Sequence, residues 1–360
     1  MRLCIDATAL LVRSAGVKTY TYNWIRALAR EAPETSISLF PFFGSIGELD
    51  HEHSAASSAA TLRGLVLLHS MNYLRLPVLS FGRWDVLHAS QMVHRPPRRM
   101  RLTATVHDMT CWSMPGLHRA RNVEATRSFG ERVLPCADAL IAVSECTRQD
   151  AIRILGLDPD RIVTIYPGID PRFFDAAPAR RGKPYFLYVG TIEPRKNIGT
   201  LLDAWAGLSG SIREQYELVI AGPEGWGVGG TMARLRAGAP GVRYIGYVPE
   251  QDLPALTAGA AAFVYPSIYE GFGFPVAQAL AAGVPVITSN VSSLPEVTGD
   301  AAILVNPHSP GQLTAAMERL ALSPSLAADL ARRGRARAER FRWDECALRS
   351  LELFRGVAGR

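Results

Sequence analysis

The residues of clearest chemical interest are a carboxylate and the glycines beside it. Glu270 follows the short apolar run 263–265, which is long enough for a buried strand, and Gly271 and Gly273 let another molecule approach the backbone. Pro275 suits the first position of a helix, where its missing N–H costs no hydrogen bond. A carboxylate and backbone amides would then lie where open α/β sheets bind ligands. An ordinary strand-to-helix loop fits the same residues.

Two adjacent cations follow another apolar run, 185–189. Arg195 and Lys196 stand in the segment VGTIEPRKNI, at the expected start of a helix. A helix N-terminus favours negative charge, Arg offers a fork of donors and Lys a point charge, so the pair, facing the Glu270 loop, would suit a diphosphate. Surface charges on a loop are the alternative.

The first half of the chain has weaker signals. His107 and Asp108 come directly after the apolar run 102–106, where a side chain would point into the cleft of an open sheet. A histidine held by its neighbouring aspartate fits equally. Gly16 lies between a strand-like opening and an amphipathic helix over 20–30, which suits a phosphate site or a plain turn.

Neither metal-ligating pattern is convincing. Asp158 and Asp160 form a DxD sequence, but Pro159 between them favours a turn. His51 and His53 have no further ligand at suitable spacing. We therefore expect no metal site and no cofactor.

The elements that must position these residues alternate between strand and helix. This alternation predicts an α/β fold with two Rossmann-like domains that face each other across a cleft. We expect an N-terminal domain over 1–170, a Pro- and Gly-rich hinge over 171–183 and a second domain over 184–340. Residues 341–360 have helical spacing and are expected to pack back on the first domain.

Composition sets limits on partners and location. The chain has 360 residues, 48% of them hydrophobic, and a net charge of +6, too little to indicate nucleic acid. The Arg-rich stretch 331–342 predicts a solvated helix face or, less readily, contact with an anionic surface. Five scattered cysteines and the absence of an apolar run of about 18 residues favour a cytoplasmic protein with, at most, peripheral membrane contact.

Several motifs together carry a family resemblance. GTIEPRKN, GYV, YPSIYEGFGFP and ITSNVSSLPEV, with Gly16 and the His107–Asp108 pair, resemble the GT-B-fold retaining glycosyltransferases of family 4. The most similar members are bacterial mannosyl- and rhamnosyltransferases of polysaccharide assembly. The resemblance is strong over 185–307 and loose in the first domain, which is the family's acceptor side.

The resemblance implies roles for individual residues. Glu270 matches the first glutamate of an E-x7-E motif and would contact the donor sugar, and Lys196 would bind its diphosphate. Val248 would contact the nucleobase through its backbone, Gly16 would lie near the diphosphate and His107 near the donor sugar. Backbone amides of one loop would bind sugar hydroxyls and phosphate; the loop comprises Gly271, Phe272, Gly273 and Phe274. The next backbone N–H donor would be that of Val276.

Two positions depart from the family pattern. Gln278 replaces the second motif glutamate, which usually grips the ribose hydroxyls, so weaker ribose binding is expected. Thr191 stands where an arginine is common, and Arg195 is expected to supply that cation.

The resemblance implies a metal-independent hexosyltransferase. We expect transfer of mannose from GDP-mannose, with retention, to a glycan or lipid-linked glycan acceptor. Arg195 and Lys196 would stabilise the leaving diphosphate more in the transition state than in the ground state. Two alternatives stay open: a sugar-nucleotide 2-epimerase on the same fold, and a non-catalytic protein that binds nucleotide-sugars.

Overall fold

The computed structural model divides the chain into two compact units. Unit 1 comprises Met1–Gly168 and Arg342–Arg360, and unit 2 comprises Ile169–Phe341. The structure describes residues 1–11, 16–40, 58–72, 74, 84–90, 93, 100–179 and 182–359. The histidines at 51 and 53 and most of the loop before Gly16 lie outside these residues.

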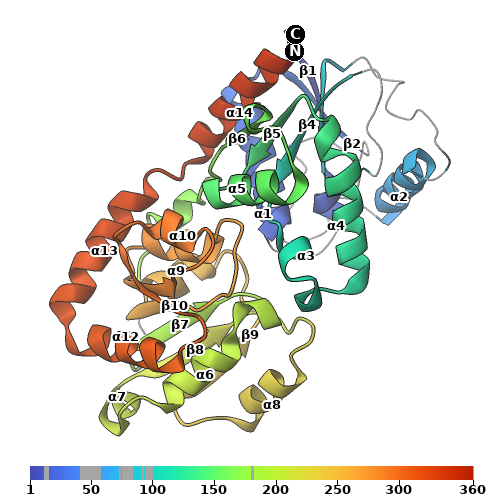
Figure 1. Cartoon of the computed structure of the whole chain (residues 1–360). Coiled ribbons are helices and arrows are strands. Elements are labelled where there is room, and N and C mark those ends of the chain that lie inside the picture. The colour runs from blue at the N-terminus through green and yellow to red at the C-terminus, as the bar shows by residue number, and fades with distance from the viewer. Residues whose placement is uncertain are drawn as a thin grey trace. The chain divides into compact units, whose positions relative to one another are not determined.

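Unit 1 is built on a parallel sheet in the order β2-β1-β3-β4-β5-β6 (Figure 1). Its strands are β1 (Arg2–Asp6), β2 (Ser36–Phe40), β3 (Val86–Ala89), β4 (Arg101–Val106), β5 (Ala139–Ala142) and β6 (Ile162–Thr164). Its helices are α1 (Gly16–Glu31), α2 (Ser58–Asn72), α3 (Thr110–Ser113), α4 (Ala120–Arg132), α5 (Glu145–Leu155) and α14 (Trp343–Ala358). The strand order reverses at β1 and β3, so the ligand crevice of this sheet is expected at their carboxyl ends.

Local sequence signals explain several elements of unit 1. Ser144 caps α5 because its hydroxyl accepts the Thr147 N–H at 3.0 Å, as the sequence predicts. Asp158 accepts the Asp160 N–H at 3.0 Å and pairs with Arg161, so the DxD sequence forms a turn.

The C-terminal helix belongs to unit 1, which confirms the prediction that it returns to the first domain. Helix α14 packs against α1. The Trp24 indole N–H donates to the Ser350 hydroxyl at 3.0 Å, and Trp24 and Phe354 are fully buried. The helical spacing of apolar residues therefore marks the face that covers α1.

Unit 2 has a second parallel sheet, in the order β12-β11-β10-β7-β8-β9. Its strands are β7 (Tyr185–Val189), β8 (Glu217–Ala221), β9 (Val242–Gly246), β10 (Ala262–Tyr265), β11 (Val286–Ser289) and β12 (Ala302–Val305). Its helices are α6 (Ile198–Ala206), α7 (Gly210–Gln215), α8 (Gly229–Ala237), α9 (Leu253–Ala258), α10 (Phe274–Ala281), α11 (Leu294–Thr298), α12 (Pro310–Leu322) and α13 (Pro324–Ala338). Its order reverses at β7 and β10, which places the loops after these strands at the expected ligand crevice. The expected α/β fold with two domains is confirmed.

The chain leaves unit 1 after Gly168 and returns to it at Arg342. Within unit 2, the Ile169 N–H donates to the Phe341 carbonyl at 2.9 Å. The expected hinge, 171–183, starts inside unit 2, where the short helix η7 (Pro171–Phe173) packs against α9 and α10. Its role as a hinge stays a prediction.

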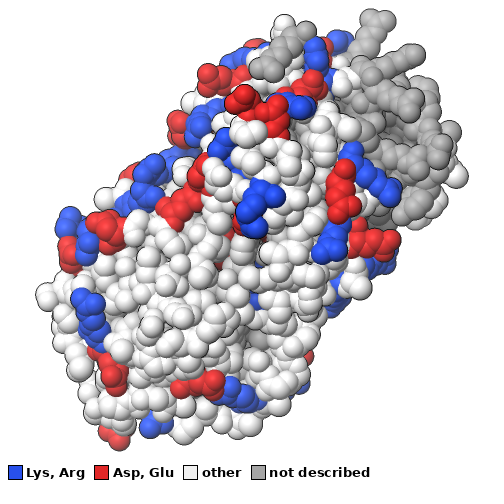
Figure 2. All heavy atoms as spheres, in the orientation of Figure 1, with Lys and Arg blue, Asp and Glu red and all other residues white. Residues whose placement is uncertain are grey.

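Much of the Arg-rich stretch lies in α13, and the arginines of this helix are engaged within unit 2. Arg332 and Arg333 pair with Asp329, and Arg337 donates to the Val297 carbonyl. On the face shown in Figure 2, basic and acidic side chains lie next to each other. These contacts favour the solvated helix face over an anionic surface.

Candidate functional site

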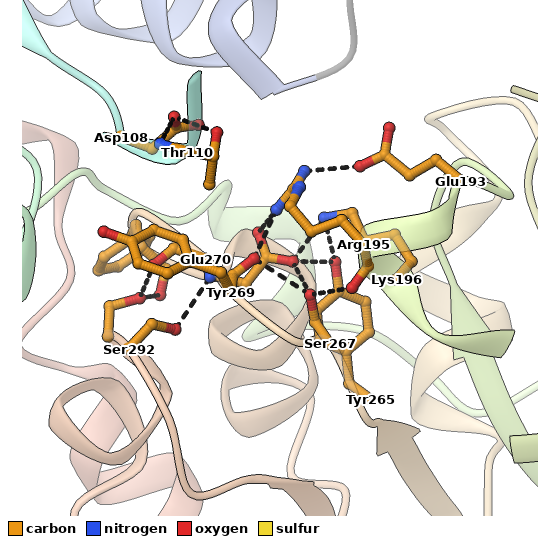
Figure 3. A network of polar contacts seen from close by, with 12 residues as sticks. Asp108, Thr110, Glu193, Arg195, Lys196, Tyr265, Ser267, Tyr269, Glu270 and Ser292 are labelled. Atoms are coloured by element: carbon orange, nitrogen blue, oxygen red, sulfur yellow. Dashed lines mark hydrogen bonds and ion pairs between the residues drawn. The ribbon is translucent and has the colours of Figure 1, made fainter. Parts of the chain in front are cut away.

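The sequence-predicted cations and carboxylate of unit 2 form one buried cluster (Figure 3). Lys196 Nζ lies 2.6 Å from Oε1 of Glu270, and an Arg195 guanidinium nitrogen lies 3.0 Å from Oε2. Lys196 is 9% exposed and Glu270 is 7% exposed. Residues 74 and 75 positions apart in the sequence therefore meet at the carboxyl ends of β7 and β10.

A second carboxylate balances the charge of the cluster. Glu193, also buried, accepts from Arg195 at 2.7 Å. Two cations therefore face two carboxylates. Neutral donors complete the shell, since the Ser267 hydroxyl donates to Glu270 Oε1 at 2.7 Å and the Tyr265 hydroxyl at 3.1 Å.

These contacts control the ionisation of the cluster. Burial by itself raises the pKa of the Glu270 carboxyl, but Arg195 and Lys196 outweigh burial and hold that pKa at about 2. Burial and the like charge of Arg195 lower the pKa of Lys196, while Glu270 opposes the shift. Burial and Glu270 raise the pKa of Tyr265 well above its usual value, so its phenol stays a neutral donor.

Backbone geometry holds the two cations in place. The short helix η8 (Pro194–Lys196) ends at Asn197, which has a left-handed backbone with φ of 60°. The Asn197 amide donates to the carbonyls of Pro266 at 3.1 Å and Pro307 at 2.6 Å. The side chain of Asn197 thus ties the loop after β7 to the loop after β10.

The Glu270 turn is held by two serines that precede α11. The Ser292 hydroxyl accepts the Glu270 N–H at 2.9 Å (Figure 3). The buried Ser293 hydroxyl lies 2.9 Å from the Glu270 carbonyl oxygen and 2.8 Å from that of Phe272. Both backbone polar groups of Glu270 are therefore paired with neighbouring side chains.

The glycine-rich loop leads directly into α10. Gly273 has φ of 100°, which favours glycine, and an added Cβ would lie 2.8 Å from a Leu294 methyl group. Gly271 and Phe272 are buried, and Phe274, partly buried, is the first residue of α10.

Three other predicted residues of unit 2 differ in how accessible they are to a ligand. The Val276 N–H donates to the Gly273 carbonyl at 3.0 Å and is engaged within the first turn of α10. Gln278 lies on α10, partly exposed. Val248 is partly buried and follows β9.

His107 and Asp108 of unit 1 lie at the carboxyl end of β4. His107 follows β4 and lines a cavity of about 60 Å³ with Asp6, Tyr20, His88 and other residues. Burial lowers the pKa of His107 to about 4, although Asp108 opposes the shift, so the ring is neutral near pH 7.

Asp108 and Gly16 have clear local roles. The Asp108 carboxylate accepts the Thr110 N–H at 2.9 Å and its hydroxyl at 2.6 Å at the start of α3. Gly16 is the first residue of α1, which begins earlier than the sequence indicates. Among the described residues, no atom lies within 4 Å of a Cβ added to Gly16.

Sequence reasoning missed several residues of both units. Glu193 lies in the motif GTIEPRKN, and the adjacent serines 292 and 293 lie in ITSNVSSLPEV. Their residue types alone do not show which groups they form hydrogen bonds or ion pairs with. Asp6, 3% exposed, accepts from the hydroxyls of Thr8 at 2.7 Å and Ser90 at 2.6 Å. The sequence signal that could have indicated Asp6 is its position, since it is a carboxylate at the end of the apolar strand β1.

The described residues offer neither a metal centre nor a helix that could span a membrane. No group of three or more His, Cys, Asp or Glu side chains in this part of the chain could hold a metal ion. No helix among the same residues is both long and apolar enough to cross a membrane.

Comparison with known proteins identifies the family. Residues 14–173 match the family described as Glycosyltransferase Family 4, and residues 170–337 match Glycosyl transferases group 1. O-antigen chain mannosyltransferase B from Escherichia coli is 30% identical over 368 aligned residues, covering 94% of this chain and 96% of that protein. The chain belongs to glycosyltransferase family 4. This family 4 glycosyltransferase is therefore a transferase enzyme.

Two further comparisons extend the likeness. The family 4 glycosyltransferase is 28% identical to the serotype-specific mannosyltransferase WbdA of Escherichia coli over 61% of this chain and 29% of WbdA. Sucrose-phosphate synthase from Thermosynechococcus elongatus superimposes with a TM-score of 0.73 at 19% identity, covering 99% of both chains. The structural likeness supports the GT-B fold.

Proposed function

We propose that this glycosyltransferase moves mannose from GDP-mannose to a glycan acceptor, with retention of configuration, during assembly of a bacterial polysaccharide. The observation that carries the proposal is the end-to-end similarity to O-antigen chain mannosyltransferase B. The similarity to WbdA, which is also a mannosyltransferase, supports the same sugar.

In this proposal, unit 2 holds the donor through the cluster of Glu193, Arg195, Lys196 and Glu270. Because two cations are already balanced by two carboxylates, a diphosphate must compete with Glu270 for Lys196 and Arg195. The incoming phosphates would draw the two cations toward themselves. Glu270, held at its backbone, would then have carboxylate oxygens available for the hydroxyls of the donor sugar.

The chemical step breaks the bond between the sugar carbon C1 and the phosphate oxygen. Negative charge grows on the leaving diphosphate, and Arg195 and Lys196 stabilise it more as the bond lengthens. The acceptor hydroxyl oxygen bonds to C1 on the face that the diphosphate leaves. Its proton passes to a phosphate oxygen, so the products are a glycoside and GDP.

We assign no protein nucleophile to the reaction. The Ser267 and Tyr265 hydroxyls donate to Glu270 Oε1 and would stay there when Lys196 and Arg195 turn toward the phosphates, so the carboxylate is a poor nucleophile. The role of Glu270 is therefore to bind and orient the sugar.

We further propose that the reaction needs no metal ion and that unit 1 binds the acceptor. Arg195 and Lys196 supply the positive charge that a divalent ion would otherwise supply to the diphosphate. A lipid-linked acceptor has less support than the sequence indicates, because the arginines of α13 are engaged within unit 2.

A donor and acceptor panel tests the proposal. The purified protein is incubated with EDTA and GDP-mannose, GDP-fucose, UDP-glucose or dTDP-rhamnose, with and without mannose-terminated oligosaccharides. We expect a product larger by one mannose from GDP-mannose alone, with an α linkage by NMR. Free sugar formed equally well without acceptor would indicate epimerase or hydrolase chemistry. Binding of a nucleotide-sugar without turnover would indicate a binding protein.

A further inference from the structure

Ser292 has an unfavourable backbone at the edge of the cluster. Among the described residues, Asn197 and Ser292 are the non-glycine residues with positive φ, at 60° and 54°. The left-handed region is costly for an L-residue other than glycine, and asparagine tolerates it better than serine. Strain of this kind often occurs at functional sites, where the surrounding structure maintains it.

The side chain of Asn197 accounts for its own conformation. Its amide donates to the Pro266 and Pro307 carbonyls, and its carbonyl oxygen accepts the Thr200 hydroxyl at 2.7 Å. These bonds join separate loops and stabilise the fold. Asn197 is thus a structural residue and a matched comparison for Ser292.

Among the residues that the structure describes, the Ser292 hydroxyl has one hydrogen-bond partner, and that partner belongs to the candidate site. Its hydroxyl accepts the Glu270 N–H at 2.9 Å, while Ser293 pairs with the Glu270 carbonyl. Ser292 itself is partly exposed, so water can replace its hydroxyl at little cost to folding. A glycine at 292 would suit the backbone better, yet it would release one end of Glu270.

We propose that Ser292 is a positioning residue that fixes the backbone of Glu270, and through it the carboxylate, in the orientation that the donor sugar requires. The proposal rests on the proposed function, because it assigns the donor sugar to Glu270. Ser292 holds the Glu270 turn through its hydroxyl, while its left-handed backbone lowers the stability of the folded protein. Its contribution is therefore to turnover and not to folding.

Three variants separate backbone strain from the hydroxyl group. Ser292→Gly removes both, and Ser292→Ala removes only the hydroxyl. Asn197→Gly is the control, because it relaxes the same kind of backbone but removes bonds between loops. We expect a melting temperature at or above that of the wild type for Ser292→Gly, one close to that of the wild type for Ser292→Ala, and a clear decrease for Asn197→Gly.

Kinetics and hydrogen exchange give the decisive readouts. Both Ser292 variants should lose at least fivefold in kcat with GDP-mannose, while the Kd for GDP, which lacks the sugar, stays within twofold. Exchange of the backbone amides in the peptide 266–274 should become faster in both. Wild-type turnover in Ser292→Gly, or unchanged exchange, would overturn the proposal. If the wild type itself transfers no sugar, the proposed function fails, and the exchange experiment still tests whether Ser292 holds Glu270.

Discussion

The Lys196 ammonium lies 2.6 Å from the Glu270 carboxylate, and both side chains are buried. A buried ion pair loses much of its Coulomb energy to desolvation, so its presence alone is weak evidence of stabilisation. Removing one partner, in contrast, leaves a charge that the protein must accommodate. The pair is therefore suited to a site where a charged ligand exchanges with a side chain.

Lys196 and Glu270 should be strongly coupled in a double-mutant cycle. We expect Lys196→Met and Glu270→Gln each to reduce the free energy of unfolding by about 3 kcal/mol and to abolish transfer. The double variant should be less destabilised than the sum, with a coupling of about 1–3 kcal/mol. Urea denaturation measures the energies. The exposed pair Arg234–Asp203, at 2.7 Å, is the control and should couple by less than about 1 kcal/mol. Additive effects at Lys196 and Glu270 would contradict the interpretation.

Acid should destabilise the protein through Glu270. The folded-state pKa of about 2 lies below the ordinary value of 4.5, so the unfolded chain takes up the proton first as the pH falls. This contribution is present above pH 4.5 and is lost as the pH approaches 2, which amounts to about 3 kcal/mol. Denaturant titrations of the wild type and Glu270→Gln from pH 2 to 6 measure it. Equal slopes against pH in the two proteins would be inconsistent with a depressed pKa.

Gln278 offers a direct test of ribose binding. Gln278→Glu restores a charged acceptor on α10, and hydrogen bonds to a charged acceptor are roughly twice as strong as neutral ones. We expect GDP to bind about tenfold more tightly, equivalent to about 1.4 kcal/mol, by isothermal titration calorimetry. An acyclic GDP analogue without ribose hydroxyls is the matched ligand and should show no gain. A similar gain in affinity for GDP and for the analogue would show that the added carboxylate does not act on the ribose hydroxyls.

Asp6 should stabilise the carboxyl ends of β1 and β3. Its carboxylate accepts from both hydroxyls and both backbone amides of Thr8 and Ser90. Asp6→Asn replaces one accepting oxygen with an NH2 group, which would face the N–H and the hydroxyl of either Thr8 or Ser90. We therefore expect the free energy of unfolding to decrease by about 2 kcal/mol. Ser90→Ala removes one donor and should cost about 1 kcal/mol. Urea denaturation measures both, and a neutral Asp6→Asn would rule out this role.

Much of the architecture could be predicted because it depends on local patterns. The alternating apolar runs indicate the two parallel sheets, and Ser144 marks the start of α5. The spacing of Trp343 and Phe354 indicates the buried face of α14. These signals are read within about 15 residues, which is the scale on which periodicity is informative.

The partners within the site could not be predicted in the same way. The sequence indicates that Arg195 and Lys196 face the Glu270 loop as ligands for a diphosphate, but it does not show that both form salt bridges to Glu270 itself. The left-handed backbone of Ser292 was also invisible, since serine gives no local signal for it. Residue type therefore predicts the chemistry, and the register of the strands determines which groups meet.

The equal number of cations and carboxylates in the Glu193–Glu270 cluster has a consequence for selectivity. A neutral cluster exerts little net attraction on small anions such as inorganic phosphate, however abundant they are. A nucleotide-sugar differs from such anions because it brings two kinds of group. Its phosphates replace Glu270 as partners of the cations, and its sugar hydroxyls replace the cations as partners of Glu270. Discrimination against simple anions would then follow from internal neutralisation, without a separate gate.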